Sequence, residues 1–397
     1  MSTTTTPTDG TAPATRRYVR LLPGDPAPWF RQATAANPRF SFDTVAGRYI
    51  VLLFHLSAGD GLSRAALDAV AANRHLFDDA KVSFFGVTLD REDSRQGRVP
   101  DMIPGIRHFL DFDGTVARAY GAVPETAETV TPEDTRRFWL ILDPMLRVLD
   151  VVAMRPDGAD RDAVLKRIAD LPPVARFAGR PIQAPVLFLP HVFEPALCRR
   201  LIDHYESVGG RESGFMRDVD GKTTLVHDHS HKRRRDVEIA DAALIRETQA
   251  RIRRRVVPEI RKVHQFEVTR MERYLIGCYE AADQGHFRPH RDNTTRGTAH
   301  RRFAVSINLN DDFEGGDVFF PEYGPDGMVP PPGGAVVFSC SLLHSVRPVT
   351  RGRRFAFLPF LYDEAAARLR SENNQFLADG IGSYRDGLPP EDRSSET

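Results

Sequence analysis

Two histidines, a carboxylate and an arginine stand in an order that constrains the C-terminal half of this chain more than any other feature. His290 and Asp292 are separated by one residue, His344 follows after 51 intervening residues, and Arg354 comes ten positions later. Imidazole nitrogens and a carboxylate oxygen are ligands for a first-row metal ion, and an arginine behind them can anchor an anion. We therefore expect His290, Asp292 and His344 to meet at one metal ion.

The chemistry of these three ligands favours iron. Two neutral imidazoles and one carboxylate occupy one face of six-coordinate Fe(II) and leave three positions open for a chelating co-substrate and O₂, which is the facial triad of non-haem iron enzymes. The spacing of the first two ligands fits a strand, because residues i and i+2 of a strand point to the same face. His290 and Asp292 would then reach the ion together, while Arg291 points away.

The surrounding sequence predicts further strands. Residues 302–310 alternate apolar residues with polar or small ones, as a half-buried strand does. Residues 333–339 and 354–360 are mainly apolar, and each is introduced by a turn or loop that contains glycine. The expected structure is a small antiparallel barrel.

A series of motifs from Tyr274 to Phe360 resembles the prolyl-4-hydroxylase-like branch of the Fe(II)/2-oxoglutarate-dependent dioxygenases. The motifs are Tyr-x-x-x-x-Tyr from Tyr274, His-x-Asp from His290, Leu-Asn-x-x-Phe-x-Gly-Gly-Asp-x-x-Phe from Leu309, Pro-x-x-Gly-x-x-x-x-Phe from Pro330, and His344 with Arg354. The resemblance implies an α+β domain with a double-stranded β-helix, or jelly roll, at its core. This domain would cover residues 186–365.

The same resemblance implies the chemistry. Arg354 would pair with the distal carboxylate of 2-oxoglutarate, Tyr279 would help to hold this co-substrate, and Tyr274 is a second candidate for that role. Asn308 stands where some relatives have a tyrosine that contacts 2-oxoglutarate. The implied reaction uses Fe(II), 2-oxoglutarate and O₂, releases succinate and CO₂, and hydroxylates a C–H bond of a peptidyl proline or another amino-acid side chain. Ascorbate is the expected reductant, and a free amino acid or other small molecule is the alternative substrate.

Other interpretations of these residues remain open. A lone histidine such as His344 is usually a core or surface residue, and only the ordered set indicates a metal site. Arg353 is the rival of Arg354, although it should lie on the opposite face of the strand. A cupin-type metal-binding jelly roll would not need this arginine. Because Asp292 is present, a variant that accepts a halide, which needs that carboxylate removed, is disfavoured.

The amino-acid composition disfavours some classes of binding partner and indicates a cellular compartment. Lysine plus arginine and aspartate plus glutamate number 54 each, so no overall field attracts nucleic acid or an acidic membrane. Three cysteines, Cys198, Cys278 and Cys340, are too few for a disulfide framework and fit a reducing compartment. The sequence contains no bilayer-spanning stretch and no signal-peptide pattern. These features predict a cytoplasmic protein, and the resemblance implies a protein, peptide or small-molecule substrate.

The N-terminal half predicts a separate α/β domain. Residues 1–17 are rich in threonine and are expected to be a disordered tail. Residues 63–77 carry apolar side chains at mostly helical intervals. Three apolar stretches are typical of buried strands: residues 49–55, 82–89 and 138–144. Strands that alternate with helices indicate a three-layer α/β domain over residues 18–172.

This N-terminal domain resembles the peroxiredoxin branch of the thioredoxin superfamily. The resemblance rests on residues 24–30, the strand that ends at Phe54, residues 111–123 and the strand end at residues 142–144. A peroxidatic cysteine would sit at the N-terminus of the helix after the first strand. Ser63 stands near that place, and no cysteine occurs before position 198. Thiol-peroxidase activity is therefore disfavoured, because a peroxidatic step needs a thiolate.

A domain without its thiol can still bind or assemble. We expect it to position the substrate or to mediate self-association as a homo-oligomer. The backbone N–H groups at the start of its first helix are expected to favour an anion.

The remaining segments connect or cover the two domains. Residues 173–185 contain proline and glycine and predict a linker, and residues 366–397 predict a polar C-terminal tail. Helices are expected from residue 194 and over residues 241–263, outside the barrel. The basic segment 227–235 is interpreted as a solvated loop leading into a strand, with no partners to complete a second metal site. It could attract an acidic part of a substrate.

Overall fold

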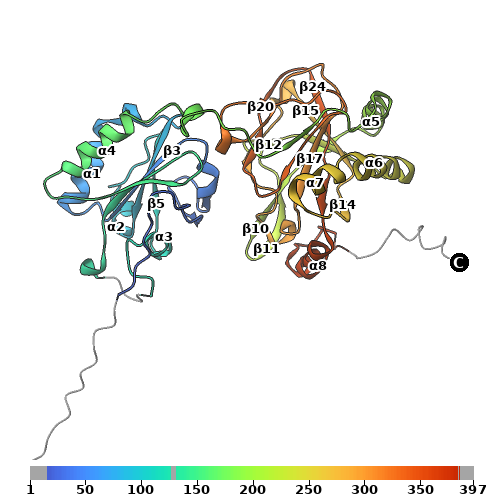
Figure 1. Ribbon diagram of the computed structural model, residues 1–397. Helices are drawn as coiled ribbons and strands as arrows, with labels where there is room; N and C mark the ends of the chain where they lie inside the picture. Colours follow the sequence, from blue (N-terminus) through green and yellow to red (C-terminus); the bar gives the residue numbers. More distant parts are fainter. Residues whose placement is uncertain (1–15, 127–130, 383, 385–397) are drawn as a thin grey trace, which may run out of the picture. The chain divides into compact units, whose positions relative to one another are not determined.

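The computed structural model describes residues 16–126, 131–382 and 384, and the chain forms two compact units, residues 1–180 and 181–397 (Figure 1). The predicted linker contains the boundary between these units. The predicted N-terminal tail lies outside the described residues up to position 15. Among the residues that the structure describes, no helix combines the length and the apolar character that crossing a membrane requires.

A five-stranded mixed sheet forms the centre of the first unit. Its order is β5-β4-β3-β6-β7, in which β3 pairs parallel with β4 and antiparallel with β6. The strands are β3 (Tyr49–Leu56), β4 (Val82–Thr88), β5 (Ile106–Leu110), β6 (Phe138–Leu142) and β7 (Val148–Ala153). The three apolar stretches predicted as strands form β3, β4 and β6, and every residue of these three strands is buried.

Both faces of this sheet are covered, which gives the predicted three-layer arrangement. The helices α1 (Gly61–Ala72) and α4 (Ala159–Ala169) pack on one face through Val70, Val164 and Ile168 (Figure 1). The short helix α3 (Thr115–Ala119) and a group of aromatic rings cover the other face. Those rings include Phe30, Phe42, Phe54, Phe109, Tyr120 and Phe138.

The start of α1 is occupied by a carboxylate of the chain itself. Asp60 accepts hydrogen bonds from the backbone N–H groups of Leu62 at 3.1 Å and Ser63 at 3.0 Å. Arg137 lies 2.8 Å from the same carboxylate oxygen, and the Ser63 hydroxyl donates to the carbonyl of His55. The expectation that this helix start favours an external anion is therefore wrong, because Asp60 already accepts from those donors.

Two antiparallel sheets face each other in the second unit and form the predicted jelly roll. The larger sheet has the order β14-β25-β17-β24-β15-β13-β9, and β21 and β8 extend it from β17. Its strands are β14 (Arg270–Glu272), β25 (Phe360–Tyr362), β17 (Phe303–Asn308), β24 (Arg353–Phe357), β15 (Leu275–Glu280), β13 (Arg235–Glu238), β9 (Arg211–Glu212), β21 (Ala335–Ser339) and β8 (Leu187–Leu189). The smaller sheet consists of β12 (Lys232–Arg233), β16 (His286–His290), β22 (His344–Val346), β19 (Val318–Phe319) and β20 (Gly327–Met328).

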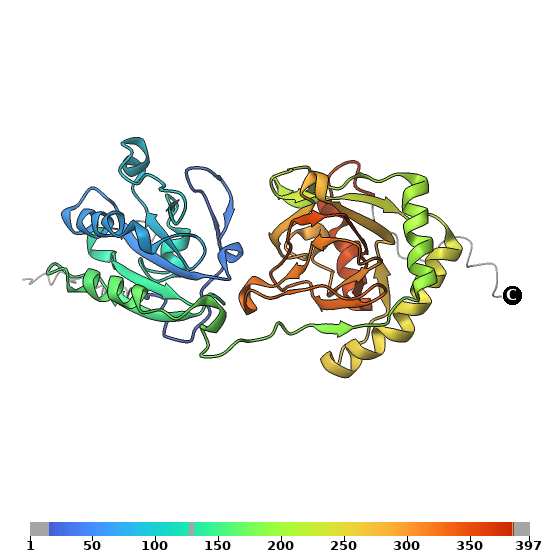
Figure 2. The same cartoon turned by 90° about the horizontal axis from the view of Figure 1, so that it is seen from above.

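Three helices cover the outer face of the larger sheet, as Figure 2 shows. They are α5 (Pro195–Val208), α6 (Ala242–Arg255) and α7 (Val257–His264). The helix expected over residues 241–263 is thus divided, with Pro258 in the first turn of α7. Side chains of β17 alternate as predicted: Phe303, Val305 and Ile307 pack beneath the helices, whereas Ala304, Ser306 and Asn308 face the barrel interior.

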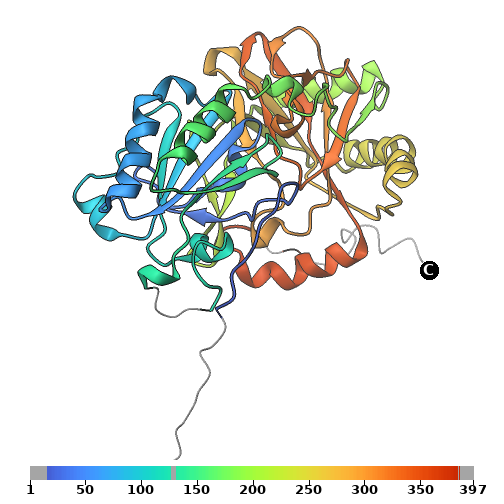
Figure 3. The same cartoon turned by 60° about the vertical axis from the view of Figure 1, so that its left-hand side comes forward.

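The C-terminal segment folds against the barrel. The helix α8 (Glu364–Glu372, red in Figure 3) is followed by the short helix η8 (Asn373–Phe376). This segment meets the hairpin of β10 (Phe215–Val219) and β11 (Lys222–Val226), because the backbone N–H of Ala378 donates to the carbonyl of Thr223 at 3.0 Å. Residues 366–382 are therefore part of the folded unit, which corrects the expected tail for these positions, whereas 383 and 385–397 lie outside the described residues.

The basic segment also departs from expectation. Its second half forms β12 and leads into β13. Lys232 and Arg234 retain only 4% and 8% of their exposure. The interpretation as a solvated loop is therefore wrong for these two residues, which lie inside the barrel.

Candidate metal centre

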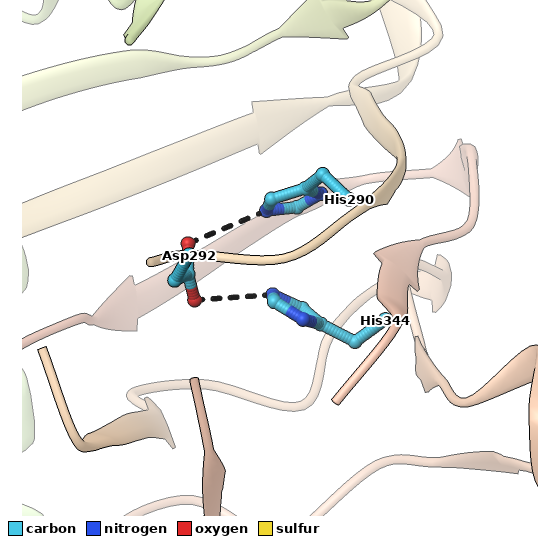
Figure 4. A group of neighbouring side chains, drawn as sticks. All are labelled: His290, Asp292 and His344. Carbon is cyan, nitrogen blue, oxygen red and sulfur yellow. Dashed lines mark ion pairs between the residues drawn. The ribbon is translucent and has the colours of Figure 1, made fainter. Parts of the chain in front are cut away.

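The pairing of two strands brings the predicted ligands together. His290 ends β16 and His344 begins β22, and the antiparallel register sets the two histidines opposite each other. The carboxylate of Asp292 faces both imidazole rings (Figure 4). One ligand atom from each of the three residues lies within 4.8 Å of the others. This arrangement has the size of a site for a single metal ion.

Asp292 reaches the site from a turn. β16 ends at His290, and its pairing with β22 is irregular between Phe287 and His290. The backbone N–H of Asp292 donates to the carbonyl of Cys340 at 2.9 Å, which fixes the turn against the end of β21. The two residues meet as expected, although turn geometry and not strand alternation brings them together.

Hydrogen bonds orient both imidazoles. The Nδ1 atom of His290 lies 2.7 Å from the carbonyl oxygen of Arg288, and that of His344 lies 3.0 Å from the carbonyl oxygen of Leu342. A neutral histidine that donates from Nδ1 presents an Nε2 lone pair, as metal-bound histidines do. The Nε2 atoms lie 3.5 Å and 3.3 Å from the two oxygens of Asp292.

The electrostatics of the three residues fit a bound cation. Burial opposes ionisation of Asp292, yet His344 and His290 beside it hold the pKa of that carboxyl well below its usual range. Burial, together with His344, lowers the pKa of His290 to about 4. The stable forms are thus a carboxylate and a neutral imidazole. Lone pairs and a carboxylate directed at one another repel unless a proton or a cation lies between them, so the residues fit a divalent metal ion.

The residue between the first two ligands stabilises the site from outside. Arg291 is 7% exposed and turns away from the triad, as predicted, to pair with Glu322 at 3.1 Å. Glu322 also accepts from the backbone N–H of Leu343, next to His344, at 3.3 Å. This ion pair connects the segments that carry the two histidines.

Arg354 lies inside the barrel with part of its guanidinium unsatisfied. It is 1% exposed, and it donates from Nε to Asn308 at 2.9 Å and from Nη2 to Ser306 at 2.8 Å. Among the described residues, its buried Nη1 has no hydrogen-bond partner and no carboxylate lies within 4.0 Å of the guanidinium. A buried guanidinium without a counter-ion is unfavourable, so this group fits the carboxylate of a ligand.

The neighbouring arginine faces the other way. Arg353 pairs with Glu206 at 2.7 Å, and its side chain is 44% exposed. Of the two candidate anchors, only Arg354 points into the barrel.

The two tyrosines of the Tyr-x-x-x-x-Tyr motif lie on opposite sides of the sheet. Tyr279 faces the interior, where its ring centroid is 5.4 Å from the Cζ atom of Arg354 and its hydroxyl accepts from Arg234 at 3.3 Å. Tyr274 packs beneath α6 and hydrogen-bonds to Gln249 of that helix. The structure therefore does not bring Tyr274 to the site. A separation of five residues could have revealed this, because strand residues an odd number apart face opposite sides.

The Gly-Gly-Asp motif makes room for Arg354. Gly315 and Gly316 both have positive φ, at 72° and 64°. A Cβ atom on Gly316 would approach Val349 Cγ2 at 2.8 Å and Arg354 Cδ at 3.1 Å. The second glycine is thus needed for its backbone conformation and for the space beside the guanidinium.

Comparisons with known families match the two units separately. Residues 269–362 match the family model of the 2OG-Fe(II) oxygenase superfamily, a range that includes the triad, Tyr279 and Arg354. Residues 23–145 match the model of the AhpC/TSA family. The predicted joining of an Fe(II)/2-oxoglutarate oxygenase domain to a peroxiredoxin-like domain is confirmed.

Several solved structures are similar to parts of the chain. A viral collagen prolyl hydroxylase from Paramecium bursaria Chlorella virus-1 is 14% identical, covers 45% of this chain and 96% of its own, and has a TM-score of 0.35. A prolyl-4-hydroxylase from Pseudomonas putida is 15% identical, with 45% and 92% covered and a TM-score of 0.34. Peroxidoxin BcpB from Mycobacterium tuberculosis is 18% identical, with 40% and 98% covered and a TM-score of 0.32.

Proposed function

We propose that this chain, a 2-oxoglutarate-dependent oxygenase joined to an AhpC/TSA-type domain, hydroxylates a C–H bond of a peptidyl proline or another amino-acid side chain. Succinate and CO₂ would be the co-products. The observation that carries this proposal is the combination of an iron-type triad with a buried arginine, Arg354, whose Nη1 lacks a partner among the described residues. A metal site alone would fit many reactions, whereas the additional buried cation fits a dicarboxylate co-substrate.

Each residue has a separate task in this proposal. His290 and His344 would bind Fe(II) through Nε2, and Asp292 would bind it through a carboxylate oxygen. Arg354 would hold the distal carboxylate of 2-oxoglutarate through Nη1, with Tyr279 beside it. Bound iron, with 2-oxoglutarate and O₂, supplies the oxidising power for insertion of oxygen into a C–H bond. Ascorbate would re-reduce iron that has oxidised without substrate.

The N-terminal unit would add no redox step. The described residues before position 180 contain no thiol, and the start of α1 carries the Asp60–Arg137 ion pair. We propose that this unit positions the substrate or mediates self-association. The three cysteines are free and buried, which fits residence in a reducing compartment such as the cytoplasm.

The proposal is tested with the purified chain under anaerobic conditions. It should bind one Fe(II) and, once O₂ is admitted, convert 2-oxoglutarate slowly to succinate without a substrate. His290→Ala, Asp292→Ala and His344→Ala should each abolish this turnover. His286→Ala is the matched control, because His286 lies on β16 but outside the triad. Full activity in one of the three variants would remove that residue from the ligand set.

A cupin-like jelly roll without 2-oxoglutarate is the alternative. It would bind the metal but would not need Arg354. Metal-dependent turnover that is indifferent to 2-oxoglutarate would favour it.

A further inference from the structure

Besides Arg354, two more basic side chains are buried inside the barrel. Lys232 lies in β12, and Arg234 comes directly after the end of this strand. Both side chains turn inward and are largely shielded from solvent. Arg234 has its own counter-ion, because its Nε and Nη2 atoms lie 2.6 Å and 2.7 Å from the two oxygens of Asp236. Its positive charge is therefore balanced within the chain.

Lys232 has no such counter-ion. Its ammonium donates to the Ser213 hydroxyl at 2.7 Å and to the carbonyl of Gly214 at 2.6 Å, which are both uncharged acceptors. Among the described residues, Lys232 reaches a carboxylate only through the Ser213 hydroxyl, which donates to Asp236 at 2.5 Å. An ammonium has three donors, so one remains for a further acceptor. A buried cation without an anion is unfavourable, which makes Lys232 a candidate for binding one.

The position of Lys232 links it to the metal end of the barrel. Lys232 stands opposite Phe287 in the register of β12 and β16, and its Nζ atom lies 4.9 Å from the centroid of the Phe287 ring. The Phe287 ring stacks on the imidazole of His290, with centroids 3.5 Å apart. The ammonium and a metal ligand thus contact the same aromatic ring from strands of one sheet.

The surrounding charges leave room for an anion. Burial lowers the pKa of Lys232 well below its usual value, Arg234 and Arg273 lower it further, and Asp236 and Asp292 oppose this effect. Asp236 already pairs with Arg234, and the charge of Asp292 would be shared with the metal ion. These neighbours give Lys232 no counter-ion of its own, so an external carboxylate would stabilise its protonated form.

We propose that Lys232 binds a carboxylate of a ligand at the metal end of the barrel. This inference rests on the proposed function and extends it. Two sources can supply the group: the carboxylate of 2-oxoglutarate that Arg354 does not hold, or a carboxylate on the oxidised substrate. The second source would make the substrate an amino acid, or a chain end, with a free carboxylate near the reacting carbon.

A purely structural role makes a different prediction. Lys232 could serve only to brace Ser213 and Gly214, in which case an uncharged donor would replace it. Lys232→Gln keeps an N–H donor but removes the charge. Lys232→Met removes both, and Arg233→Met is the matched control, because Arg233 is the next residue of β12 and faces the other side of the strand.

The experiment uses the full chain with Fe(II) in the absence of O₂. Affinity for 2-oxoglutarate is followed by the visible charge-transfer band of its iron chelate. N-acetyl-L-proline and N-acetyl-L-prolinamide, which differ in a carboxylate and an amide, are then titrated calorimetrically into the 2-oxoglutarate complex. Thermal unfolding of each variant checks that the protein is folded. If Lys232→Met does not fold, Lys232→Gln alone tests the role of the lysine charge.

The two sources give distinct results. Weakening of 2-oxoglutarate binding by about 10- to 100-fold in Lys232→Gln, with Arg233→Met unchanged, would identify the co-substrate carboxylate. Unchanged 2-oxoglutarate affinity with loss of the preference for acetylproline over its amide would identify a substrate carboxylate.

Two further outcomes separate this inference from the proposed function. It is overturned if 2-oxoglutarate binds the wild-type chain and Lys232→Gln equally well and the two proteins also match in the acetylproline titration, including the case in which neither acetylproline nor its amide binds. A wild-type chain that does not bind 2-oxoglutarate contradicts the proposed function instead. The acetylproline titration, repeated with Fe(II) alone, would then still decide the role of Lys232.

Discussion

Arg354 donates its Nε–H to the side-chain oxygen of Asn308 at 2.9 Å, and the amide nitrogen of Asn308 donates to the carbonyl of Pro330 at 2.9 Å. Asn308 therefore connects the guanidinium to the backbone behind it. In this chain the residue acts on Arg354 and leaves Nη1 available.

Loss of the Arg354 guanidinium should weaken the binding of 2-oxoglutarate but not the binding of Fe(II). A charge-assisted pair in a desolvated site contributes on the order of 2 to 4 kcal/mol, so Arg354→Gln should weaken 2-oxoglutarate binding by about 30- to 1000-fold. Fe(II) affinity should be unchanged, because Arg354 does not contact the triad. The measurement is an anaerobic titration of the iron chelate. Arg353→Gln is the control, and a larger effect in that variant would contradict the assignment.

Asn308 should affect the affinity for 2-oxoglutarate through its hydrogen bond to Arg354. Asn308→Ala removes the support of Nε and should weaken 2-oxoglutarate binding by about 5- to 30-fold. Asn308→Asp should weaken it at least as much, because the new carboxylate would neutralise the arginine in place of the ligand. If Asn308 had only a structural role, both variants would lose thermal stability. The folded fraction of each variant would still bind 2-oxoglutarate with unchanged affinity.

Gly316 should tolerate no side chain. Gly316→Ala adds a Cβ atom beside Arg354 at a φ of +64°, and we expect 2-oxoglutarate affinity to fall by about 3- to 30-fold. Gly380→Ala is the matched control, because Gly380 also has positive φ but its Cβ would meet nothing within 4 Å. Equal co-substrate affinity in the two variants would show that crowding of Arg354 is not involved.

The sequence predicts those parts of the site that follow from the alternation of side chains along a strand and from the order of the motifs in the chain. Strand alternation along residues 302–310 correctly predicts that Ser306 and Asn308 share one face, and the same rule separates Arg353 from Arg354. Applied to Tyr274 and Tyr279, it would have excluded Tyr274.

Contacts between distant segments could not be predicted in this way. Lys232 lies in a segment whose composition is typical of a solvated loop, yet it is buried where β12 pairs with β16 and beside Ser213 and Gly214. Residues after 365 are polar, yet Thr223 of the β10–β11 hairpin accepts a backbone hydrogen bond from Ala378. Local composition contains no information about such partners. The Asp60–Arg137 pair likewise joins residues 77 positions apart.

The N-terminal unit should show no peroxidase chemistry. With thioredoxin or glutathione as reductant, peroxide consumption by the full chain should equal that of a variant lacking Cys198, Cys278 and Cys340. A chain that begins at Pro181 should retain substrate-free turnover of 2-oxoglutarate, because the triad and Arg354 lie in the second unit. It should hydroxylate the true substrate less efficiently. Peroxidase activity that disappears when Ser63 is replaced would contradict this assignment.

His55 makes the N-terminal unit sensitive to acid. It is fully buried on β3, and neither ring nitrogen has a hydrogen-bond partner among the residues the structure describes. Its ring centroid lies 6.2 Å from that of His108, across the backbone of Gly86. Burial and His108 lower the pKa of His55 from 6.5 to about 3, Arg137 acts in the same direction, and Asp60 opposes them.

This lowered pKa fixes the sign of a pH effect. Below the unfolded pKa of 6.5 the unfolded state takes up a proton that folded His55 refuses, so stability should fall as the pH drops towards 3. Between about pH 7.5 and about pH 4.5 the loss from this residue should be about 3 kcal/mol. His55→Leu should remove that part of the loss, whereas His75→Leu, at an exposed position, should not.

The measurement is urea unfolding monitored by tryptophan fluorescence. This signal reports on the N-terminal unit alone, because both tryptophans, Trp29 and Trp139, belong to it. An equal loss of stability in the wild-type chain and His55→Leu would mean that other groups cause the acid sensitivity.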